Sequence, residues 1–145
     1  MLKVGTVYVH NNYLKTDETY GRKLLLCVGH TEDEVVFVVA TSQPHTRPEN
    51  VGCNHTHKFP HYFCAECAGN FSKSTWLDLG TSGFYEDYRE VVISQIESGT
   101  VMPLFSIKDL PDILSCVVNS KHIRKEHRKI VQQAFATFAP PVHGK

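Results

Sequence analysis

Most of the first hundred residues alternate between short runs of β-branched or apolar side chains and short polar stretches, the pattern of strands and turns. The run Val35–Ala40 is apolar at every position, as in a central strand with both faces covered. Trp76 lies in a stretch of period-2 alternation and is expected in the core, with stacking on a nucleobase as the alternative. We expect strands over residues 5–10, 23–29, 35–40, 75–79, 89–96 and 100–105.

Two helices are expected after the last of these strands. Ser106–Asp109 resembles a capping box, and the residues that follow are apolar at helical spacing up to Val117. A second helix is expected from about residue 121 to 138, with a basic and an apolar face. The pattern predicts a mainly β protein (α+β) with two C-terminal helices. A length of 145 residues fits a single domain over 1–145.

The segment from about residue 43 to 72 breaks this pattern. Its Pro, His, Asn and Cys residues predict a loop of about 30 residues, longer than a compact domain usually leaves without structure. We therefore expect some interaction to hold this segment in place.

The charges balance overall but not along the chain. The formal net charge is zero, yet six of the fifteen basic side chains and only one of the fifteen acidic ones lie from Lys121 onward. No stretch approaches the roughly 20 apolar residues that cross a bilayer, and the first residues do not resemble a secretion signal. A soluble, cytoplasmic protein is expected.

A cluster of Cys and His residues lies inside the long polar segment. Cys64 and Cys67 form a C-x-x-C pair, and Cys53, His55 and His57 precede them on one side of an extended stretch. Two of these three could complete a site, and Cys53 and His55 are favoured over His57. Zn²⁺ prefers four such ligands in a tetrahedron, and a closed site of this kind is structural. The sequence predicts a structural zinc held by Cys53, His55, Cys64 and Cys67.

Other interpretations of this cluster stay open. The segment fits a polar loop with incidental His and reduced Cys, or a catalytic zinc site with Glu66 as the only nearby acid. An HNH-type nuclease also uses clustered His and Asn, but its partner motif cannot be placed. Cys27 and Cys116 lie in apolar runs, where buried packing is the expected role.

The order of several short motifs resembles the PemK/MazF family of toxin ribonucleases. A first strand with Gly and Tyr, a Gly-Arg-apolar strand, a strand ending in Thr-Ser and a Ser-Thr-Trp strand occur in the order typical of that family. Lys23 stands where the family commonly has Pro, and the Cys/His-rich segment falls where a short connection is usual. The matching stretches are Val4–Tyr8, Gly21–Val28, Val38–Ser42, Lys73–Leu79 and Ile93–Leu110.

The resemblance implies a small SH3-like barrel over about residues 4–118, with an insertion over about 43–72. It also implies metal-independent cleavage of single-stranded RNA by attack of the ribose 2′-hydroxyl on the adjacent phosphate. On this basis Arg22 would hold the phosphate and assist proton transfer, and Thr41 or Ser42 would position it. His10, at the end of the first strand, is a candidate additional acid or base.

The basic C-terminal helix is a second candidate RNA contact. Arg124, Lys125 and Arg128 on that helix, together with Lys23, are expected to contact phosphates, and a solvated helix face is the alternative. The sequence leaves two alternative hypotheses for the function. One is a toxin-like endoribonuclease with a structural zinc, with an antitoxin and a homodimer as possible partners. The other is a non-catalytic, zinc-stapled module that binds protein or nucleic acid.

Overall fold

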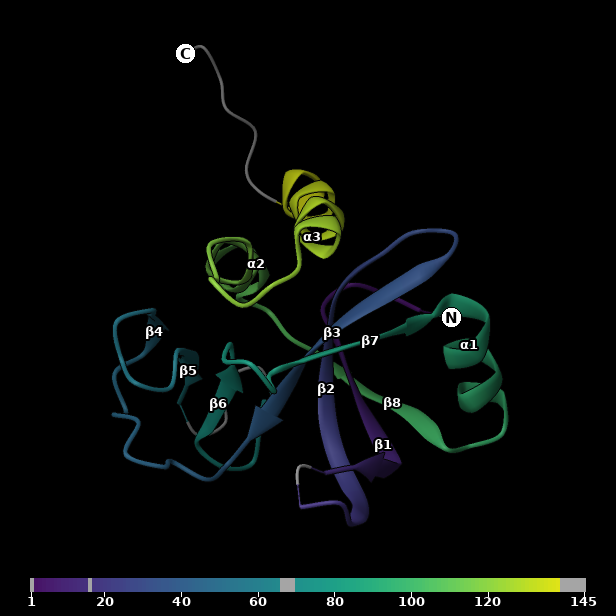
Figure 1. Cartoon of the computed structure of the whole chain (residues 1–145), viewed down its shortest axis with the longest axis horizontal. Helices are drawn as coiled ribbons and strands as arrows, with labels where there is room; N and C mark the ends of the chain where they lie inside the picture. The colour runs from purple at the N-terminus through teal and green to yellow at the C-terminus, as the bar shows by residue number, and fades with distance from the viewer. Residues whose placement is uncertain (1, 16, 66–69, 139–145) are drawn as a thin grey trace.

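A curved antiparallel sheet with helices at its faces and ends forms the framework (Figure 1). The computed structural model describes residues 2–15, 17–65 and 70–138. Within them lie eight strands and three helices: β1 (Thr6–Leu14), β2 (Tyr20–His30), β3 (Glu34–Thr41), β4 (Gly52–Asn54), β5 (His61–Cys64), β6 (Thr75–Asp78), β7 (Phe84–Tyr88), α1 (Arg89–Glu97), β8 (Val101–Ser106), α2 (Leu110–Val118) and α3 (Lys125–Phe138).

The strand β3 is the centre of the sheet. The strand order is β4-β5-β6-β3-β2-β1-β8, and β7 also pairs with β3. Along one edge of β3, β7 pairs with the first half and β6 with the second half. The residues of Val35–Ala40 are all buried, which confirms the predicted central strand.

The turn between β6 and β7 depends on a glycine. The backbone N–H of Val39 donates to the carbonyl of Gly83 (2.8 Å). A Cβ at position 83 would collide with the backbone carbonyl of Asp78. Gly83 therefore allows the chain to turn tightly, and the turn places Asp78 beside the end of β3.

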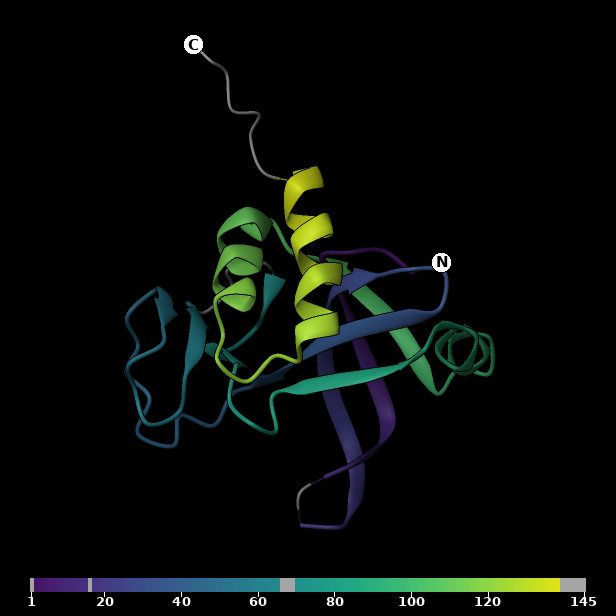
Figure 2. The same cartoon turned by 45° about the horizontal axis from the view of Figure 1, so that its top comes forward.

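Alternation of side chains along the strands gives the sheet two apolar faces. One face, with Leu26, Val28 and Val38, packs against α2 and α3. The other face, with Leu25, Cys27 and Phe37, packs with α1. In Figures 1 and 2, α2 and α3 lie side by side, with α3 over β2 and β3 and α2 on the side toward β4.

The two C-terminal helices are confirmed, with one change of boundary. The helical apolar residues Leu110, Ile113, Leu114 and Val117 are buried in α2. The last helix begins at Lys125 rather than near residue 121. No helix in the described residues is long and apolar enough to span a membrane.

The strand expected over residues 89–96 is wrong, because this segment forms α1. Val91, Val92 and Ile93 are β-branched and favour a strand locally. Only Val92 is fully buried, while Val91 is 37% exposed, so the segment places one helical side on the sheet. The strand β7, just before it, was not expected from the sequence.

The sheet is not closed into a barrel, which corrects the expected architecture. The described end strands β4 and β8 do not pair with each other. The segment over residues 43–72 also differs from the loop that the sequence predicts. It contributes β4 and β5, which extend the sheet outward from β6.

Several contacts hold this inserted segment against the sheet. The indole Nε1 of the buried Trp76 donates to the carbonyl of Pro48 (3.0 Å), so Trp76 is a core residue as expected. Arg47 lies 3.8 Å from the carboxylate of Asp78 in β6. A disulfide joins Cys53 in β4 to Cys116 in α2. These contacts join the segment to β6 and to α2.

Candidate functional site

Two adjoining hollows lie where β2 begins and β3 ends. Their volumes are about 490 and about 580 Å³, and Lys23 and Thr41 line both of them. We call the smaller one the basic hollow and the larger one the aromatic hollow. The two hollows therefore adjoin at Lys23 and Thr41.

The basic hollow brings together the residues predicted from the Gly-Arg and Thr-Ser motifs. Leu24 and Ala40 form the last pair of the antiparallel β2–β3 ladder, and Arg22 and Ser42 follow just beyond this pair and both line the hollow. None of the described residues that line it is acidic, whereas Arg22 and Lys73 are basic, so the hollow carries a positive charge. Its polar lining includes Arg22, Lys23, Thr41, Ser42, Asn70 and Lys73.

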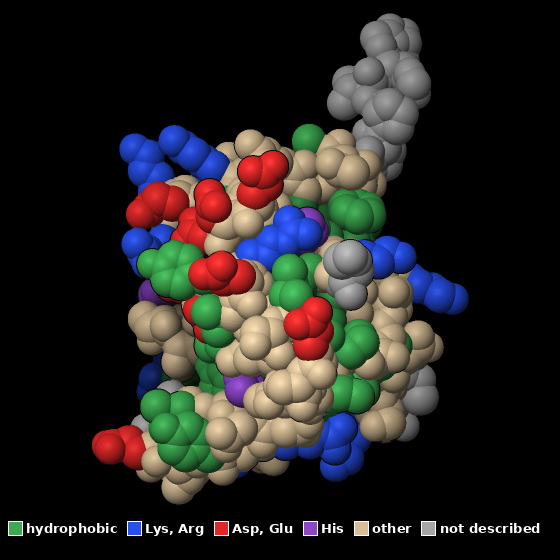
Figure 3. Space-filling view, turned by 90° about the vertical axis from the view of Figure 1, so that its right-hand side faces the viewer, with side chains coloured by type: hydrophobic (Ala, Val, Ile, Leu, Met, Phe, Trp, Pro, Cys, Tyr) green, Lys and Arg blue, Asp and Glu red, His purple; other side chains and the backbone are tan. Residues whose placement is uncertain are grey.

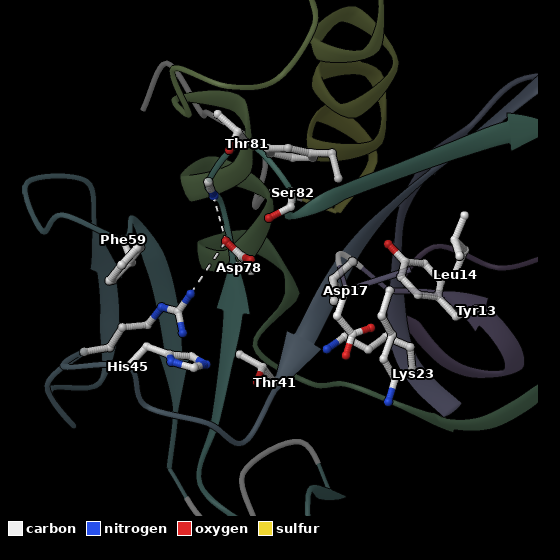
Figure 4. A pocket seen from close by; sticks show the side chains of 15 residues that line it. Tyr13, Leu14, Asp17, Lys23, Thr41, His45, Phe59, Asp78, Thr81 and Ser82 are labelled. Atoms are coloured by element: carbon white, nitrogen blue, oxygen red, sulfur yellow. Dashed lines mark hydrogen bonds and ion pairs between the residues drawn. The ribbon is translucent and has the colours of Figure 1, made fainter. Parts of the chain in front are cut away.

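The aromatic hollow lies between the β1–β2 hairpin and the inserted segment. In Figure 4, Tyr13 and Lys23 enter from the hairpin, Phe59 and His45 from the insert, and Asp78 lies between them. The sequence analysis did not assign Tyr13, His45 or Phe59 to a site. Each belongs to a polar or loop-like stretch, so only the folded chain brings them together.

Lys23 occupies the boundary between the two hollows and is half-buried. Burial lowers the pKa of its ammonium group, the charge of Lys15 lowers this pKa further, and Asp78 opposes the change. A lysine with a lowered pKa keeps a larger fraction of neutral amine near neutrality. Only the neutral amine can act as a base, so this shift makes Lys23 a better candidate for that role than a lysine in water.

Arg47 is a buried arginine that the sequence analysis did not single out. Its Nη1 donates to the carbonyls of Gln43 (3.1 Å) and Pro44 (3.4 Å), and its guanidinium lies 5.4 Å from the ring centroid of Phe59. Its Nε is buried and makes no hydrogen bond within the described residues. These contacts give Arg47 a structural role in shaping the wall of the aromatic hollow.

His10 lies behind the hollows rather than at their surface. It is buried, and its ring makes edge contacts with the rings of Tyr13 (5.8 Å) and Tyr85 (5.9 Å). Burial lowers the pKa of His10, although Asp87 opposes this change. His10 pairs with Lys23 across β1 and β2, so it supports the floor of the site without lining either hollow.

The basic helix lies far from these hollows. Gly29, near the end of β2, packs against Ile130 of α3, whereas Arg22 is near the start of β2. Seven residues of strand separate Arg22 from Gly29, a span of roughly 23 Å. The helix and the basic hollow are therefore separate surfaces.

Two of the three predicted basic residues of α3 have intramolecular partners. Arg124, just before the helix, lies 3.5 Å from Glu86 and 3.2 Å from Glu126. Arg128 donates to the carbonyl of Ser120 (2.9 Å). Lys125 is exposed. On the face shown in Figure 3, acidic and basic side chains are interspersed, as on an ordinary solvated surface.

The Cys/His cluster forms a different group from the one predicted. His55 Nε2 lies 3.1 Å from the Cys53 sulfur and 3.7 Å from the Cys116 sulfur. These three residues could hold a metal ion, although the two cysteines are at disulfide distance. Cys116, expected only to pack, is both buried and bonded, because spacing along the chain does not reveal a partner 63 residues away.

Cys64 does not belong to this group of described residues. Cys64 is a free, buried cysteine of β5, and burial raises the pKa of its thiol to about 12, which keeps the thiol protonated. Cys67 lies outside the described residues. The C-x-x-C pair therefore remains a sequence prediction.

Comparisons with protein-family models, with curated proteins and with solved structures found no match.

Proposed function

We propose that this protein is an endoribonuclease that binds single-stranded RNA across the two hollows and cleaves it by a metal-independent reaction. The observation that carries the proposal is the convergence of Arg22, Thr41 and Ser42 on one basic hollow. These residues come from two separate motifs of the chain. The strand motifs that resemble the PemK/MazF toxins support a distant relation to that family, with an SH3-like core opened by the insert.

The basic hollow has the chemistry for a phosphate. The guanidinium of Arg22 is exposed and has the fork geometry that donates two parallel hydrogen bonds to phosphate oxygens. Lys73 adds positive charge, and the hydroxyls of Thr41 and Ser42 supply further donors. The absence of a carboxylate from its described lining means that no fixed negative charge opposes an anion there.

The aromatic hollow has the chemistry for an adjoining nucleobase. Its volume of about 580 Å³ falls in the range of about 300–1,000 Å³ usual for small-molecule sites. The rings of Tyr13 and Phe59 line it, and Phe59 is 37% exposed. Aromatic rings stack on bases with little sequence preference, whereas the Asp78 carboxylate can accept a hydrogen bond from a base amino group.

Lys23 is the proposed general base. Its neutral amine accepts the proton of the ribose 2′-hydroxyl, and the 2′-oxygen attacks the adjacent phosphorus while the bond to the 5′-oxygen breaks. The departing 5′-oxygen takes a proton from solvent. The products are a 2′,3′-cyclic phosphate and a 5′-hydroxyl. Arg22 stabilises the charge that develops on the non-bridging oxygens.

A binding module without catalysis is the second candidate. The burial of His10 favours it, because the imidazole expected to act as acid or base does not reach the hollows. In that case the same hollows would hold RNA without cleaving it. An antitoxin-like protein partner and a homodimer belong to the first proposal and follow from the resemblance alone. A cytoplasmic location remains an expectation from the sequence.

The test is cleavage of a labelled single-stranded RNA by the purified protein in EDTA. We expect cyclic-phosphate products, and Arg22→Ala should lower the rate roughly 100-fold or more. Lys108→Ala removes one exposed positive charge away from the hollows and serves as the matched control. Equal rates for Arg22→Ala and the wild type would eliminate the catalytic assignment.

A second variant separates catalysis from binding. Lys23→Met should remove the dependence of the rate on the deprotonation of a lysine, which appears as the loss of one limb of the pH–rate profile. RNA that binds with salt-dependent affinity but stays intact with the wild-type protein would favour the binding module.

A further inference from the structure

We propose that Cys53, His55 and Cys116 form a zinc site when their disulfide is reduced, so that reduction converts this position from a disulfide to a Zn²⁺ site. The proposal does not depend on the RNA-cleaving function. It rests on three potential ligand atoms that lie within 4.8 Å of one another.

The distances to His55 already suit a metal. In a tetrahedral site with Zn–S near 2.3 Å and Zn–N near 2.0–2.1 Å, a sulfur and a nitrogen ligand lie about 3.6 Å apart. His55 Nε2 is 3.1 Å from the Cys53 sulfur and 3.7 Å from the Cys116 sulfur. The main change required is separation of the two sulfurs to about 3.8 Å, the tetrahedral edge for two thiolates.

The local backbone favours this arrangement. Cys53 and His55 are two residues apart at the end of β4 and point to the same side. The side chain of Asn54 accepts hydrogen bonds from the backbone N–H groups of Thr56 (3.1 Å) and His57 (3.0 Å). His55 lies between Asn54 and Thr56 in the chain, so this turn orients it.

The two cysteines differ in a way that allows the exchange. Cys116 is buried on the helix α2, whereas Cys53 is exposed on a three-residue strand at the edge of the sheet. An external thiolate can therefore reach the Cys53 sulfur. After reduction, a short edge strand can move more readily than the packed helix, and Cys53 supplies the adjustment that separates the sulfurs.

The reaction balances with a dithiol reductant. The reductant transfers two electrons and two protons to the disulfide, giving two cysteine thiols and an oxidised, disulfide form of the reductant. Zn²⁺ then displaces two protons as it binds both thiolates and the neutral imidazole of His55, and a water molecule fills the fourth position. No further oxidant or reductant is needed for the forward step.

The test measures metal binding in both redox states of the full chain. The protein is stripped with EDTA, either left oxidised or reduced and desalted anaerobically, and then titrated with Zn²⁺ by calorimetry. Co²⁺ replaces Zn²⁺ for spectroscopy, because thiolate-to-cobalt bands report sulfur ligation. We expect one equivalent bound with sulfur ligation by the reduced protein, and at least tenfold weaker binding by the oxidised protein.

Variants identify the ligands. Cys53→Ser and His55→Ala change residues outside the core and should each weaken binding by the reduced protein at least tenfold. Cys64→Ser is the matched control, because Cys64 is a free cysteine outside the group, and should leave binding unchanged. Circular dichroism checks that each variant is folded.

Three results would overturn the proposal. Equal zinc affinity in the oxidised and reduced protein would exclude the exchange. Unchanged binding in Cys53→Ser would remove Cys53 from the site. Loss of binding in Cys64→Ser would assign the metal to a site built on the C-x-x-C pair.

Discussion

The disulfide between Cys53 and Cys116 should supply a large part of the stability of the fold. It joins residues 63 positions apart, and the loop contains β5, β6, β7, α1 and β8. In the chain-entropy model, closing a loop of this length in the unfolded state corresponds to about 4 kcal/mol at 25 °C. That value compares with about 5–15 kcal/mol for the total stability of a typical domain.

The perturbation is Cys53→Ser, which changes an exposed side chain and leaves Cys116 in the core. The unfolding entropy of a chain of this length is about 300 cal/mol/K. A loss of about 4 kcal/mol should therefore lower the midpoint of thermal unfolding by about 13 °C. Reduction of the wild-type disulfide should have the same effect.

The assay is urea unfolding followed by circular dichroism, in EDTA so that no metal stabilises the reduced protein. Oxidised wild type, reduced wild type and Cys53→Ser with and without reductant are compared. The variant should not respond to the reductant, which serves as the control. A loss below about 1 kcal/mol on reduction would refute the loop-closure reasoning, since the model requires about four times that value.

Three further predictions test other parts of the fold. Gly29→Ala should cost about 1–3 kcal/mol of unfolding free energy, because the new Cβ would lie 2.9 Å from Ile130 Cγ2. A double-mutant cycle with Ile130→Ala tests this contact, and losses of unfolding free energy that simply add would contradict it. Trp76→Phe should lower the free energy of unfolding by about 1–3 kcal/mol, because the carbonyl of Pro48 loses its indole donor. Urea unfolding followed by circular dichroism measures this loss, and a variant as stable as the wild type would argue against the hydrogen bond. The buried His61 has a pKa lowered from its ordinary value of 6.5, mainly by burial. The unfolded state therefore binds more protons than the folded state below pH 6.5, and the free energy of unfolding should fall as the pH drops from 7.5 to 5.5. This group contributes at most about 1.4 kcal/mol per pH unit to that fall. His61→Gln should reduce that slope, and an unchanged slope would exclude His61 as its source.

Much of the sheet and both C-terminal helices were predictable because their hydrophobic patterns are strong and local. Val35–Ala40 is apolar throughout and forms the buried central part of β3. The spacing of Leu110 and Leu114 matched the buried side of α2. The strand predicted over residues 89–96 is wrong for a physical reason. Its β-branched residues favour a strand locally, and packing of Val92 against the sheet favours the helix instead.

The candidate site was predictable only in part. Arg22, Thr41 and Ser42 lie at the ends of strands that are close in sequence, so the antiparallel register brings them together. Tyr13 comes from the β1–β2 hairpin and Phe59 from the insert, and 46 positions separate them in the sequence. Their proximity depends on how the insert folds against β6, which no local pattern specifies.

The sequence by itself determined the alternating strands, the central apolar β3 and the two helical stripes, because each depends on neighbours a few residues away. The tertiary structure decided which distant groups meet. Only the folded chain shows that the insert extends the sheet and leaves it open, or that Cys53 pairs with Cys116 rather than with the nearby C-x-x-C. Such long-range choices depend on the packing of the whole sheet, which the spacing of residues along the chain does not encode.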